Sequence, residues 1–277
     1  MSKKLIIFLI SSATIIVILF LLGILVKRAK NQKPQHTQNR QTSTTTTSTT
    51  NSIEVSTSPA PTFIPPETLD ANDYTVEWII VRDPKKVFLY SNLQDEFTSA
   101  EALKKHGCDQ LITGGFYSQN NTNLGLIISE GALIEEAISS KLFNGFFYIT
   151  NDETFSISGT QPDTKNVRLA LQSGPLLFKN SAPQSLNIEN DENARRVVVG
   201  TTQKDEIVYL VFYYKPSPLL GPKLAELPEL LRNIQTSTNL KFNSALNLDG
   251  GSHSAFLSQQ VHISEISRPG SFFCIKP

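Results

Sequence analysis

The stretch ALNLDGGSHS at residues 245–254 passes from apolar residues into small residues and then into polar ones. Its apolar start predicts a β-strand over 244–248. The glycine pair at 250–251 can adopt positive φ, so a plain turn is its ordinary interpretation. The polar residues that follow favour a second interpretation, in which a ligand approaches the backbone closely and the N–H groups form an anion-binding nest.

Two earlier segments show the same pattern, in which an apolar run ends in small residues. They read LITGGFY at 111–117 and LQSGPLL at 171–177. Strand ends that carry small residues and a few polar groups commonly build ligand sites, since small side chains leave room for the ligand. We therefore expect one cleft that Asp249 and Arg196 face together. The small residues expected in its wall are Gly114, Gly115, Ser173, Gly174, Gly250 and Gly251.

The C-terminal part of the chain, roughly 200 residues, has the usual size of one domain with a core. Short runs of β-forming residues recur there between Gly, Asn, Asp and Pro. Strands are expected at 75–82, 87–91, 110–113, 125–129, 145–150, 169–172, 196–201, 207–214 and 244–248. Helices are expected at 98–105, with Asp95 or Ser99 as the cap, and at 223–236. The expected fold class is therefore α+β, with a strand-rich mixed sheet and few helices.

The segment RRVVVG at 195–200 places a guanidinium at the start of a strongly apolar strand. Strand alternation predicts that Arg196, Val198 and Gly200 share one face, whereas Val197 and Val199 lie on the other. An arginine on a buried face needs a carboxylate or a bound phosphate as its partner. An edge-strand arginine in solvent is the alternative.

The stretch from Leu5 to Val26 carries no charge and is long enough to span a membrane. As a helix it would reach roughly 33 Å, about the thickness of the hydrocarbon core. A cleaved signal peptide would have a shorter apolar run followed by small residues, whereas Lys27 and Arg28 follow here. We therefore expect an uncleaved transmembrane anchor at 1–30.

Residues 31–70 form the expected tether. They include the run TSTTTTSTT at 42–50 and show no hydrophobic periodicity. Such a segment buries too little apolar surface to offset the entropy of ordering, so we expect it to be disordered. Its composition is typical of surface stalks. Although basic residues flank the anchor on both sides, we therefore expect a single-pass membrane protein with the domain at 71–277 outside the cytoplasm.

Charge and cysteine content narrow the classes of function. Residues 70–277 carry 18 Lys and Arg against 23 Asp and Glu, a net charge of −5, so nucleic acid is not an expected partner. Cys108 and Cys274 are too few for a disulfide scaffold and too far apart for a metal knuckle. Two separate buried thiols are the simpler interpretation, and one disulfide is the alternative in an oxidising compartment.

Five segments in the same order resemble the phosphodiester glycosidase family, from about residue 76 to residue 276. A strand ending in Asn-Gly-Gly-Phe-Phe is matched by 113–117, and a Gly-Leu segment with a later Gly is matched by 125–131. A Gln-Ser-Gly-Pro-Leu-Leu segment is matched by 172–177, and Arg-x-Ala-x-Gly is matched by 196–200. The last segment, Ala-Leu-Asn-Leu-Asp-Gly-Gly-Gly-Ser, is matched by 245–252 with one Gly lost.

The resemblance implies an enzyme that cuts the anomeric C–O bond of a sugar-1-phosphodiester in a glycan. Asp249 would then activate water or stabilise the oxocarbenium-like centre, and Arg196 would hold two phosphate oxygens. The amides of Gly250 and Gly251 would complete the anion site, and His253 would orient a sugar hydroxyl or transfer a proton. The other substrate-binding residues that the resemblance implies are Thr113, Gly114, Gly115, Gln172, Ser173, Gly174 and Ser252.

Two departures from the family pattern keep other hypotheses open. Thr113 stands where the family has Asn, and Ser252-His253-Ser254 stands where it has Gly-Ser-Ser or Gly-Ser-Thr. Because a hydroxyl offers fewer hydrogen bonds than an amide, an inactive module that binds cell-envelope polysaccharide is a second hypothesis. A metal-dependent phosphodiesterase is a third. Four His and no His-Asp spacing motif leave little to hold an ion, so we expect no metal and no cofactor.

Overall fold

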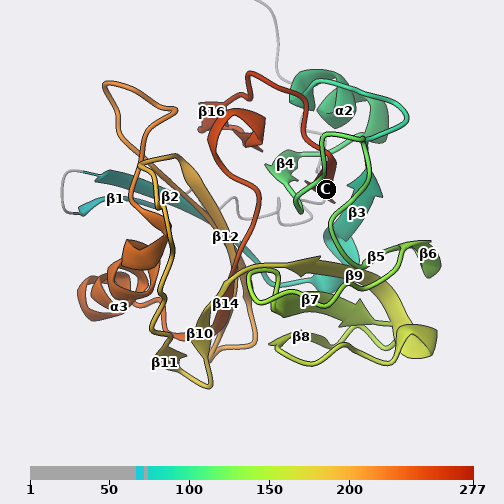
Figure 1. The fold of residues 1–277 in the computed structure, drawn as a ribbon, viewed down its shortest axis with the longest axis horizontal. Helices are drawn as coiled ribbons and strands as arrows, with labels where there is room; N and C mark the ends of the chain where they lie inside the picture. The colour runs from blue at the N-terminus through green and yellow to red at the C-terminus, as the bar shows by residue number, and fades with distance from the viewer. Residues whose placement is uncertain (1–66, 72–73) are drawn as a thin grey trace, which may run out of the picture. The chain divides into compact units, whose positions relative to one another are not determined.

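The computed structural model describes residues 67–71 and 74–277, and it describes side chains from Tyr74 onward. The predicted transmembrane anchor at 5–26 and most of the predicted tether lie outside these residues. No helix within the described residues combines the length and the apolar character that a membrane span requires. The described strands form three sheets, and two α-helices accompany them (Figure 1).

The largest sheet has seven strands in the order β1-β2-β13-β12-β14-β10-β11. Their bounds are β1 (Glu67–Ala71), β2 (Tyr74–Val81), β13 (Ile207–Tyr213), β12 (Arg196–Thr202), β14 (Phe242–Asn247), β10 (Leu176–Lys179) and β11 (Ala182–Pro183). The two central strands are tied by a long register that runs from Arg196 opposite Phe212 to Thr201 opposite Ile207. β12 and β14 pair from Val198 opposite Asn247. The 245–254 segment therefore leaves the sheet beside the start of β12.

Two five-stranded sheets complete the domain. The second sheet contains β16 (His262–Ile263), β15 (Phe256–Leu257), β4 (Gln110–Thr113), β17 (Ser271–Ile275) and β3 (Val87–Ser91), in that order. The third contains β6 (Ala132–Glu135), β5 (Ile127–Ser129), β9 (Val167–Ser173), β7 (Gly145–Thr150) and β8 (Phe155–Ser158), in that order.

The expectation of a mixed sheet is wrong, because every strand pairing among the described residues is antiparallel. For the strand pairs that are consecutive in sequence, the physical reason is the shortness of the connections. Strand pairs such as β5 with β6, β7 with β8 and β12 with β13 are joined by short turns, whereas a parallel pair needs a long crossover. The α+β class with few helices is confirmed.

The helix α3 (Leu227–Ser237) covers one face of the largest sheet (Figure 1). Its buried residues Leu227, Leu230, Leu231 and Ile234 recur at helical spacing and pack with Val198, Leu210 and Phe212 of the sheet. The 3-10 turn η3 (Leu224–Glu226) precedes it, so the helix expected at 223–236 is divided between two kinds of turn. The other 3-10 turns of the described residues are η1 (Pro84–Lys86), η2 (Thr164–Asn166) and η4 (Gly251–His253).

The helix α2 (Ser99–His106) begins one residue later than expected, and its cap is neither Asp95 nor Ser99. The side chain of Thr98 accepts the backbone N–H of Glu101, and the Glu101 carboxylate accepts the backbone N–H of Thr98. This reciprocal capping box satisfies two of the N–H groups that a helix start leaves unpaired. Gly107 ends the helix with φ of 64°.

The main core lies between the three sheets. Val197 and Val199 of β12 point into it, whereas Val198 points toward α3, which confirms the predicted alternation. Fully buried side chains from every sheet meet in this core, among them Leu89, Ile112, Phe147, Leu171, Tyr209, Leu246 and Phe273. The three segments singled out in the sequence all leave this core, so their ends are held by packing on several sides.

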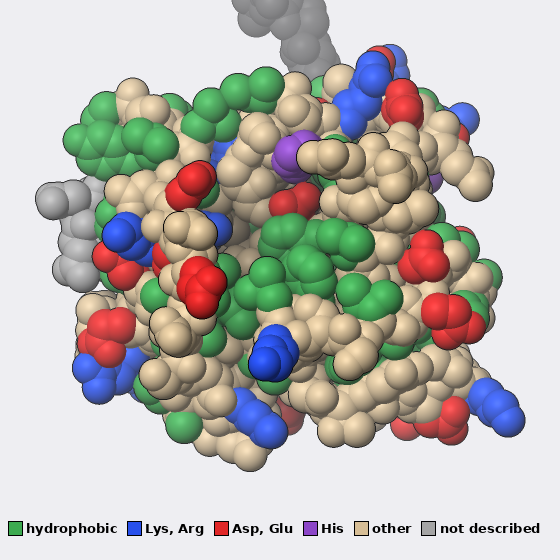
Figure 2. Space-filling view, viewed as in Figure 1, with side chains coloured by type: hydrophobic (Ala, Val, Ile, Leu, Met, Phe, Trp, Pro, Cys, Tyr) green, Lys and Arg blue, Asp and Glu red, His purple; other side chains and the backbone are tan. Residues whose placement is uncertain are grey.

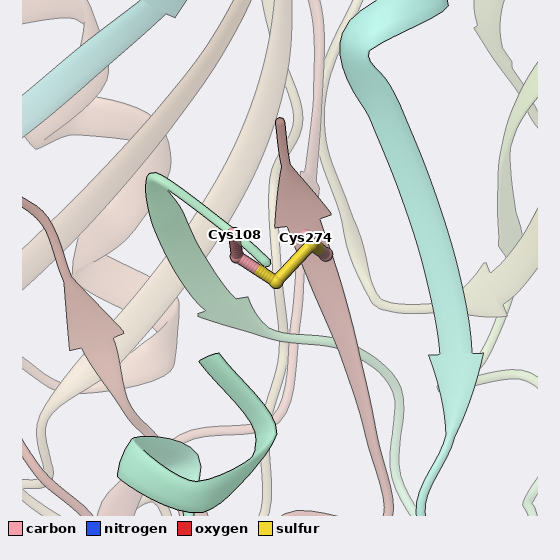
Figure 3. The surroundings of a disulfide bond; sticks show 2 residues. All are labelled: Cys108 and Cys274. Atoms are coloured by element: carbon pink, nitrogen blue, oxygen red, sulfur yellow. A yellow bond between two sulfur atoms is a disulfide. The ribbon is translucent and has the colours of Figure 1, made fainter. Parts of the chain in front are cut away.

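A disulfide joins Cys108 to Cys274 (Figure 3). Cys274 lies on β17 opposite Leu111, and the neighbouring N–H of Asp109 donates to the carbonyl of Ile275. The two Cα atoms are therefore 5.3 Å apart, within the range that a disulfide spans. Two separate thiols, the simpler interpretation of the sequence, are therefore wrong, and the disulfide alternative is confirmed. The pairing of β17 with β4 brings together two cysteines that are 166 residues apart in sequence.

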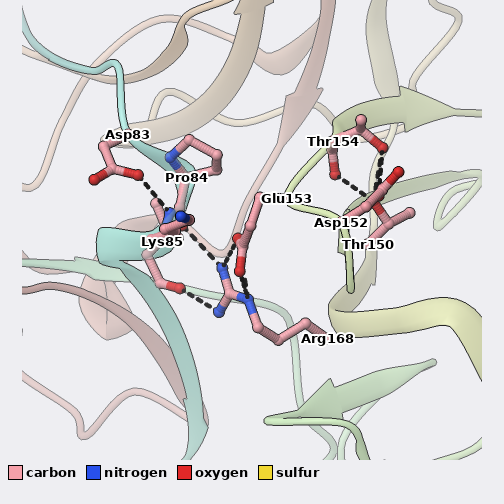
Figure 4. Close-up of polar contacts among 9 residues, drawn as sticks. Asp83, Pro84, Lys85, Thr150, Asp152, Glu153, Thr154 and Arg168 are labelled. Atoms are coloured by element: carbon pink, nitrogen blue, oxygen red, sulfur yellow. Dashed lines mark hydrogen bonds and ion pairs between the residues drawn. The ribbon is translucent and has the colours of Figure 1, made fainter.

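Arg168 of β9 connects three parts of the domain (Figure 4). Its Nε and Nη2 atoms donate to the carboxylate of Glu153, at 3.1 and 2.9 Å. Its Nη1 and Nη2 atoms also donate to the carbonyls of Val87 and Pro84. Because the guanidinium is largely buried and planar, one side chain fastens β9 to η1, to β3 and to the turn after β7.

We predict that Arg168→Lys lowers the free energy of unfolding by about 1–3 kcal/mol, because a lysine keeps the charge but cannot make the forked contacts. Arg232→Lys is the matched control, since Arg232 pairs with Glu229 at a solvent-exposed position on α3. Its loss is expected to stay below about 0.5 kcal/mol. Urea unfolding followed by tryptophan fluorescence measures both values. Equal losses would show that the buried fork of Arg168 adds nothing.

Candidate active site

The three sequence segments meet at Asp249, which lies two residues after Asn247, the last residue of β14. The N–H of Asp249 donates to the carbonyl of Gly114, at 3.0 Å. The hydroxyl of Ser173 donates to the carbonyl of Asn247, and the Asn247 amide donates to the carbonyl of Gly174. The ends of β4, β9 and β14 therefore converge, which confirms that the segments at 111–117, 171–177 and 245–254 come together.

Asp249 is only 7% exposed. Burial raises the pKa of its carboxyl group to about 7, and the backbone hydrogen bond with Gly250 opposes that rise. Burial acts in this direction because a low dielectric disfavours the charged form. A carboxyl group that titrates near neutral pH can accept or release a proton under physiological conditions, as catalytic acids and bases do.

The Asp249 side chain lines a cavity of about 500 Å³, which we call the Asp249 cavity. Its lining residues are Phe116, Tyr117, Ser118, Gln119, Asn121, Asp249 and His253. Figure 2 shows a histidine and an acidic side chain near the centre of one face, beside a group of hydrophobic side chains. The lining combines aromatic rings with hydroxyl, amide, imidazole and carboxyl groups, which suits a hydroxyl-rich ligand.

Tyr117 and His253 form one wall of the Asp249 cavity. Their rings meet edge to face, with centroids 5.3 Å apart, and the Tyr117 hydroxyl donates to the carbonyl of Arg268 at 3.0 Å. Burial is the main cause that raises the pKa of Tyr117, and the charge of Asp249 adds to it. Tyr117 therefore remains a neutral hydrogen-bonding group at physiological pH. The Ser252 hydroxyl lies 3.4 Å from Nδ1 of His253, so it can orient the imidazole.

Arg195 supports this wall from behind, a role that the sequence reasoning missed. Its guanidinium is buried and donates to the hydroxyl and carbonyl of Ser254, to the carbonyl of Gly251, and to the carbonyls of Pro218 and Ser264. Burial lowers the pKa of Arg195 to about 10, so the side chain stays cationic at neutral pH. The turn η4, which carries His253, is therefore held by hydrogen bonds from the buried Arg195 cation.

Arg196 lies elsewhere. Its Nε atom donates to the carbonyl of Pro222, and its Nη2 atom donates to the carbonyl of Glu192 and to the carboxylate of Asp191. Asp191 also accepts the backbone N–H groups of Leu224 and Ala225, so this ion pair belongs to the start of η3. A carboxylate partner for Arg196 is thus confirmed. Arg196 does not line the Asp249 cavity, and its role in holding phosphate stays a prediction.

Thr113 and Gln172 make hydrogen bonds within the fold and do not line the Asp249 cavity. The fully buried Thr113 hydroxyl accepts the N–H of Ala255 at 2.5 Å, so it ties β4 to the residues after η4. The Gln172 amide makes four hydrogen bonds, two through Oε1 and two through Nε2. They fix Leu126, Ile138 and Phe143, and a direct contact of Gln172 with substrate stays a prediction.

The glycines of the three segments allow close backbone contacts. A Cβ atom on Gly114 would lie 2.5 Å from the hydroxyl oxygen of Ser271, and one on Gly250 would lie 2.6 Å from the carbonyl oxygen of Arg195. Gly115 packs in the same way against Leu171. The N–H of Gly251 donates to the carbonyl of Arg195. That N–H already has a partner, so in this structure it does not add to an anion nest.

No cluster of three or more His, Cys, Asp or Glu side chains that could hold a metal ion occurs among residues 74–277. The Asp249 cavity is lined by one buried carboxyl group with a raised pKa, one imidazole, one phenol, one further hydroxyl, two side-chain amides and one phenyl ring. Such a set can activate a water molecule and bind a polar ring.

Comparisons with known proteins give a family and a fold. A family model described as phosphodiester glycosidase matches residues 106–272. The catalytic domain of zebrafish N-acetylglucosamine-1-phosphodiester alpha-N-acetylglucosaminidase, auto-inhibited by its pro-peptide, superposes with a TM-score of 0.60 at 14% identity. The match covers 76% of this chain and 81% of the zebrafish chain.

A second similar structure is a hypothetical protein from Synechocystis, with a TM-score of 0.50 and 12% identity. That match covers 76% of this chain and 61% of the Synechocystis chain. At these identities the two structures support the fold alone. No curated protein sequence matches this chain at a significant level.

Proposed function

The chain belongs to the phosphodiester glycosidase family, and on this premise we propose that it hydrolyses the anomeric C–O bond of a sugar-1-phosphodiester in a glycan. The observation that carries the proposal is the buried Asp249 carboxyl group, which lines a ligand-sized cavity. Its pKa of about 7 lets it accept or release a proton near neutral pH. Family membership supplies the reaction class, and Asp249 supplies the group that performs it.

In the proposed reaction, the sugar ring occupies the Asp249 cavity and its anomeric carbon lies near the Asp249 carboxylate. Water attacks the anomeric carbon, the C–O bond to phosphate breaks, and the bonding electrons leave with the phosphate monoester. The Asp249 carboxylate takes the proton from water and stabilises the oxocarbenium-like centre as positive charge develops. A phosphate monoester is a good leaving group, so it needs charge stabilisation more than a proton.

The walls of the cavity hold the ring during this step. Tyr117 and His253 meet edge to face, so they form a rigid surface against which a sugar can pack. Arg195 fixes the turn η4 through the carbonyls of Gly251 and Ser254. This preorganisation supports the proposal, because positioning contributes as much to such reactions as proton transfer does.

The identity of the products tests the proposed function. The purified protein would be incubated with the methyl phosphodiester of N-acetylglucosamine-1-phosphate in ¹⁸O-labelled water, and the products followed by ³¹P NMR and mass spectrometry. We expect unlabelled methyl phosphate and ¹⁸O-labelled sugar, because the C–O bond breaks. Label in a phosphate product would indicate cleavage of the P–O bond by a phosphodiesterase. Absence of turnover in a panel of sugars would favour the inactive binding module.

We also propose that the domain works outside the cytoplasm. The disulfide between Cys108 and Cys274 supports this location, because disulfides persist in oxidising compartments. The anchor at 5–26 and the tether remain predictions from the sequence.

A further inference from the structure

A separate cavity of about 320 Å³, which we call the Arg195 cavity, shares no lining residue with the Asp249 cavity. It lies between the largest sheet, which contributes Glu77 of β2 and Tyr213 of β13, and the segment 260–264, which contains β16. The polar side chains of that segment are exposed, so the cavity opens to solvent. A volume of this order suits a small polar molecule.

Arg195 supplies the positive end of this cavity. The carbonyls of Pro218 and Ser264, which accept N–H groups of its guanidinium, line the cavity, whereas the Gly251 carbonyl of η4 does not. Nη1 carries two N–H groups, and only one of them has an acceptor among the described residues, the Pro218 carbonyl at 3.2 Å. The other N–H is available to a ligand.

The charge of Arg195 has no direct counterion. The side chain is only 2% exposed, yet its guanidinium makes no ion pair with any carboxylate of the described residues. Its acceptors are one hydroxyl and several carbonyls, which are neutral. Buried charges are usually paired, because an unpaired charge loses its hydration without compensation. A ligand carboxylate would supply the missing negative charge.

Glu77 supplies the negative end of the same cavity. It is half-buried on β2, and its carboxylate accepts the hydroxyl of Tyr213 at 2.7 Å. An ionised carboxylate can accept about four hydrogen bonds, so this one contact leaves most of its capacity unused. No Lys or Arg of the described residues forms an ion pair with Glu77. A ligand cation would complete this end.

The two charges are held apart by the sheet. β13 stands between β2, which carries Glu77, and β12, which Arg195 precedes, so the two backbones are about 10 Å apart. The side chains do not close this distance, since they form no ion pair with each other. A ligand with a single charge is attracted by one end and repelled by the other. A ligand with opposite charges at its two ends is attracted by both.

We propose that the Arg195 cavity binds a small amino acid whose carboxylate and ammonium groups lie at opposite ends of a short chain. The carboxylate accepts the available N–H of Arg195, and the ammonium group donates to the Glu77 carboxylate. The exposed polar side chains Gln260, His262 and Ser264 border the ligand between its two ends. Binding in this cavity does not depend on the reaction at Asp249.

The experiment measures how the Tm of the full chain rises with ligand concentration at constant ionic strength, which yields Kd. The probes are 4-aminobutyrate, butyrate and butylamine, which share a four-carbon chain and differ in their charged ends. We expect 4-aminobutyrate to bind about tenfold more tightly than either singly charged probe, because each end then gains a charged partner. Equal Kd values for 4-aminobutyrate and either other probe, or no rise in Tm with any probe, would overturn the proposal.

A charge-removing variant places the ammonium group at Glu77. Glu77→Gln keeps an oxygen that accepts the Tyr213 hydroxyl but removes the negative charge. We expect it to weaken 4-aminobutyrate binding about tenfold and to leave butyrate binding equal or tighter. Glu135→Gln is the matched control, since Glu135 is a half-buried glutamate on β6 outside the lining. Equal effects of the two variants would exclude Glu77 as the ammonium partner.

A second pair of variants tests the carboxylate end. Gln260 lines the Arg195 cavity, whereas its equally exposed neighbour Gln259 does not. Gln260→Glu places a carboxylate in the lining, where it competes for Arg195, so we expect butyrate binding to weaken at least about threefold. Gln259→Glu adds the same charge one residue away and should change butyrate binding less than about 1.5-fold. Identical Kd values for the two variants would show that butyrate binds elsewhere.

Discussion

The substitution Asp249→Asn is expected to lower kcat for the sugar-1-phosphodiester by at least about a hundredfold. Asparagine keeps the shape of the side chain but cannot take a proton from water or oppose the positive charge at the anomeric carbon. The measurement is steady-state hydrolysis of the methyl diester, with folding of the variant verified by circular dichroism. A folded variant that hydrolyses the diester at the parent rate would eliminate Asp249 as the catalytic group.

The same carboxyl group sets the pH dependence of activity. Burial raises the pKa of Asp249 to about 7, and the proposed reaction uses the carboxylate form. We therefore expect kcat/KM to rise as the pH increases through about 7 and then to level off. A profile that falls through this range would show that the protonated form is the active one.

The raised pKa also predicts how stability changes with pH. In the range between 3.8 and about 7, the folded protein holds a proton on Asp249 that the unfolded chain has released. The free energy of unfolding therefore falls as the pH rises through this window, and it stays at the lower value at higher pH. Asparagine never carries the charge, so Asp249→Asn is expected to melt above the parent at roughly pH 8 and to lose that advantage under acidic conditions near pH 3.

Removing the disulfide is expected to produce the largest loss of stability. Replacing Cys108 and Cys274 together by Ser should lower the free energy of unfolding by about 2–5 kcal/mol, because the bond closes a long loop of the unfolded chain. Urea unfolding provides the measurement. Reduction of the parent by dithiothreitol should cause a similar loss, and it should leave the double variant unchanged. A parent protein that is indifferent to reductant would contradict the bond.

Much of the strand pattern could be predicted from the sequence. The strands at 87–91, 110–113 and 145–150 begin and end where expected, because each is an apolar run bounded by turn residues. Short edge strands such as β6 and β16 were missed, since two to four residues carry little periodicity. The missed β17 is a continuous apolar run, SFFCI, whose type the alternation pattern alone does not decide.

The site could be predicted only in part, for a related reason. Asp249 and the convergence of three segments follow from local sequence, because small residues after apolar strands limit what such a segment can do. The direction in which a long side chain points does not follow from local sequence. Arg195 and Arg196 are adjacent in sequence, yet the first holds η4 while the second pairs with Asp191. The direction of Arg195 depends on Ser254, which lies far along the chain. The position of the Tyr117 ring also depends on a residue far along the chain, because a Cβ atom on Gly270 would lie 2.5 Å from that ring.

The position of β17 has a consequence for how the domain assembles. β17 lies between β3 and β4, although both of these strands precede it by most of the length of the domain. Until β17 arrives, β3 and β4 lack their shared partner and expose unpaired edges, which are prone to aggregate. Contacts of such long range also slow folding, since a large loop must close before the contacts form. Chaperone assistance is therefore expected to matter most after β3 and β4 have been synthesised and before β17 pairs with them.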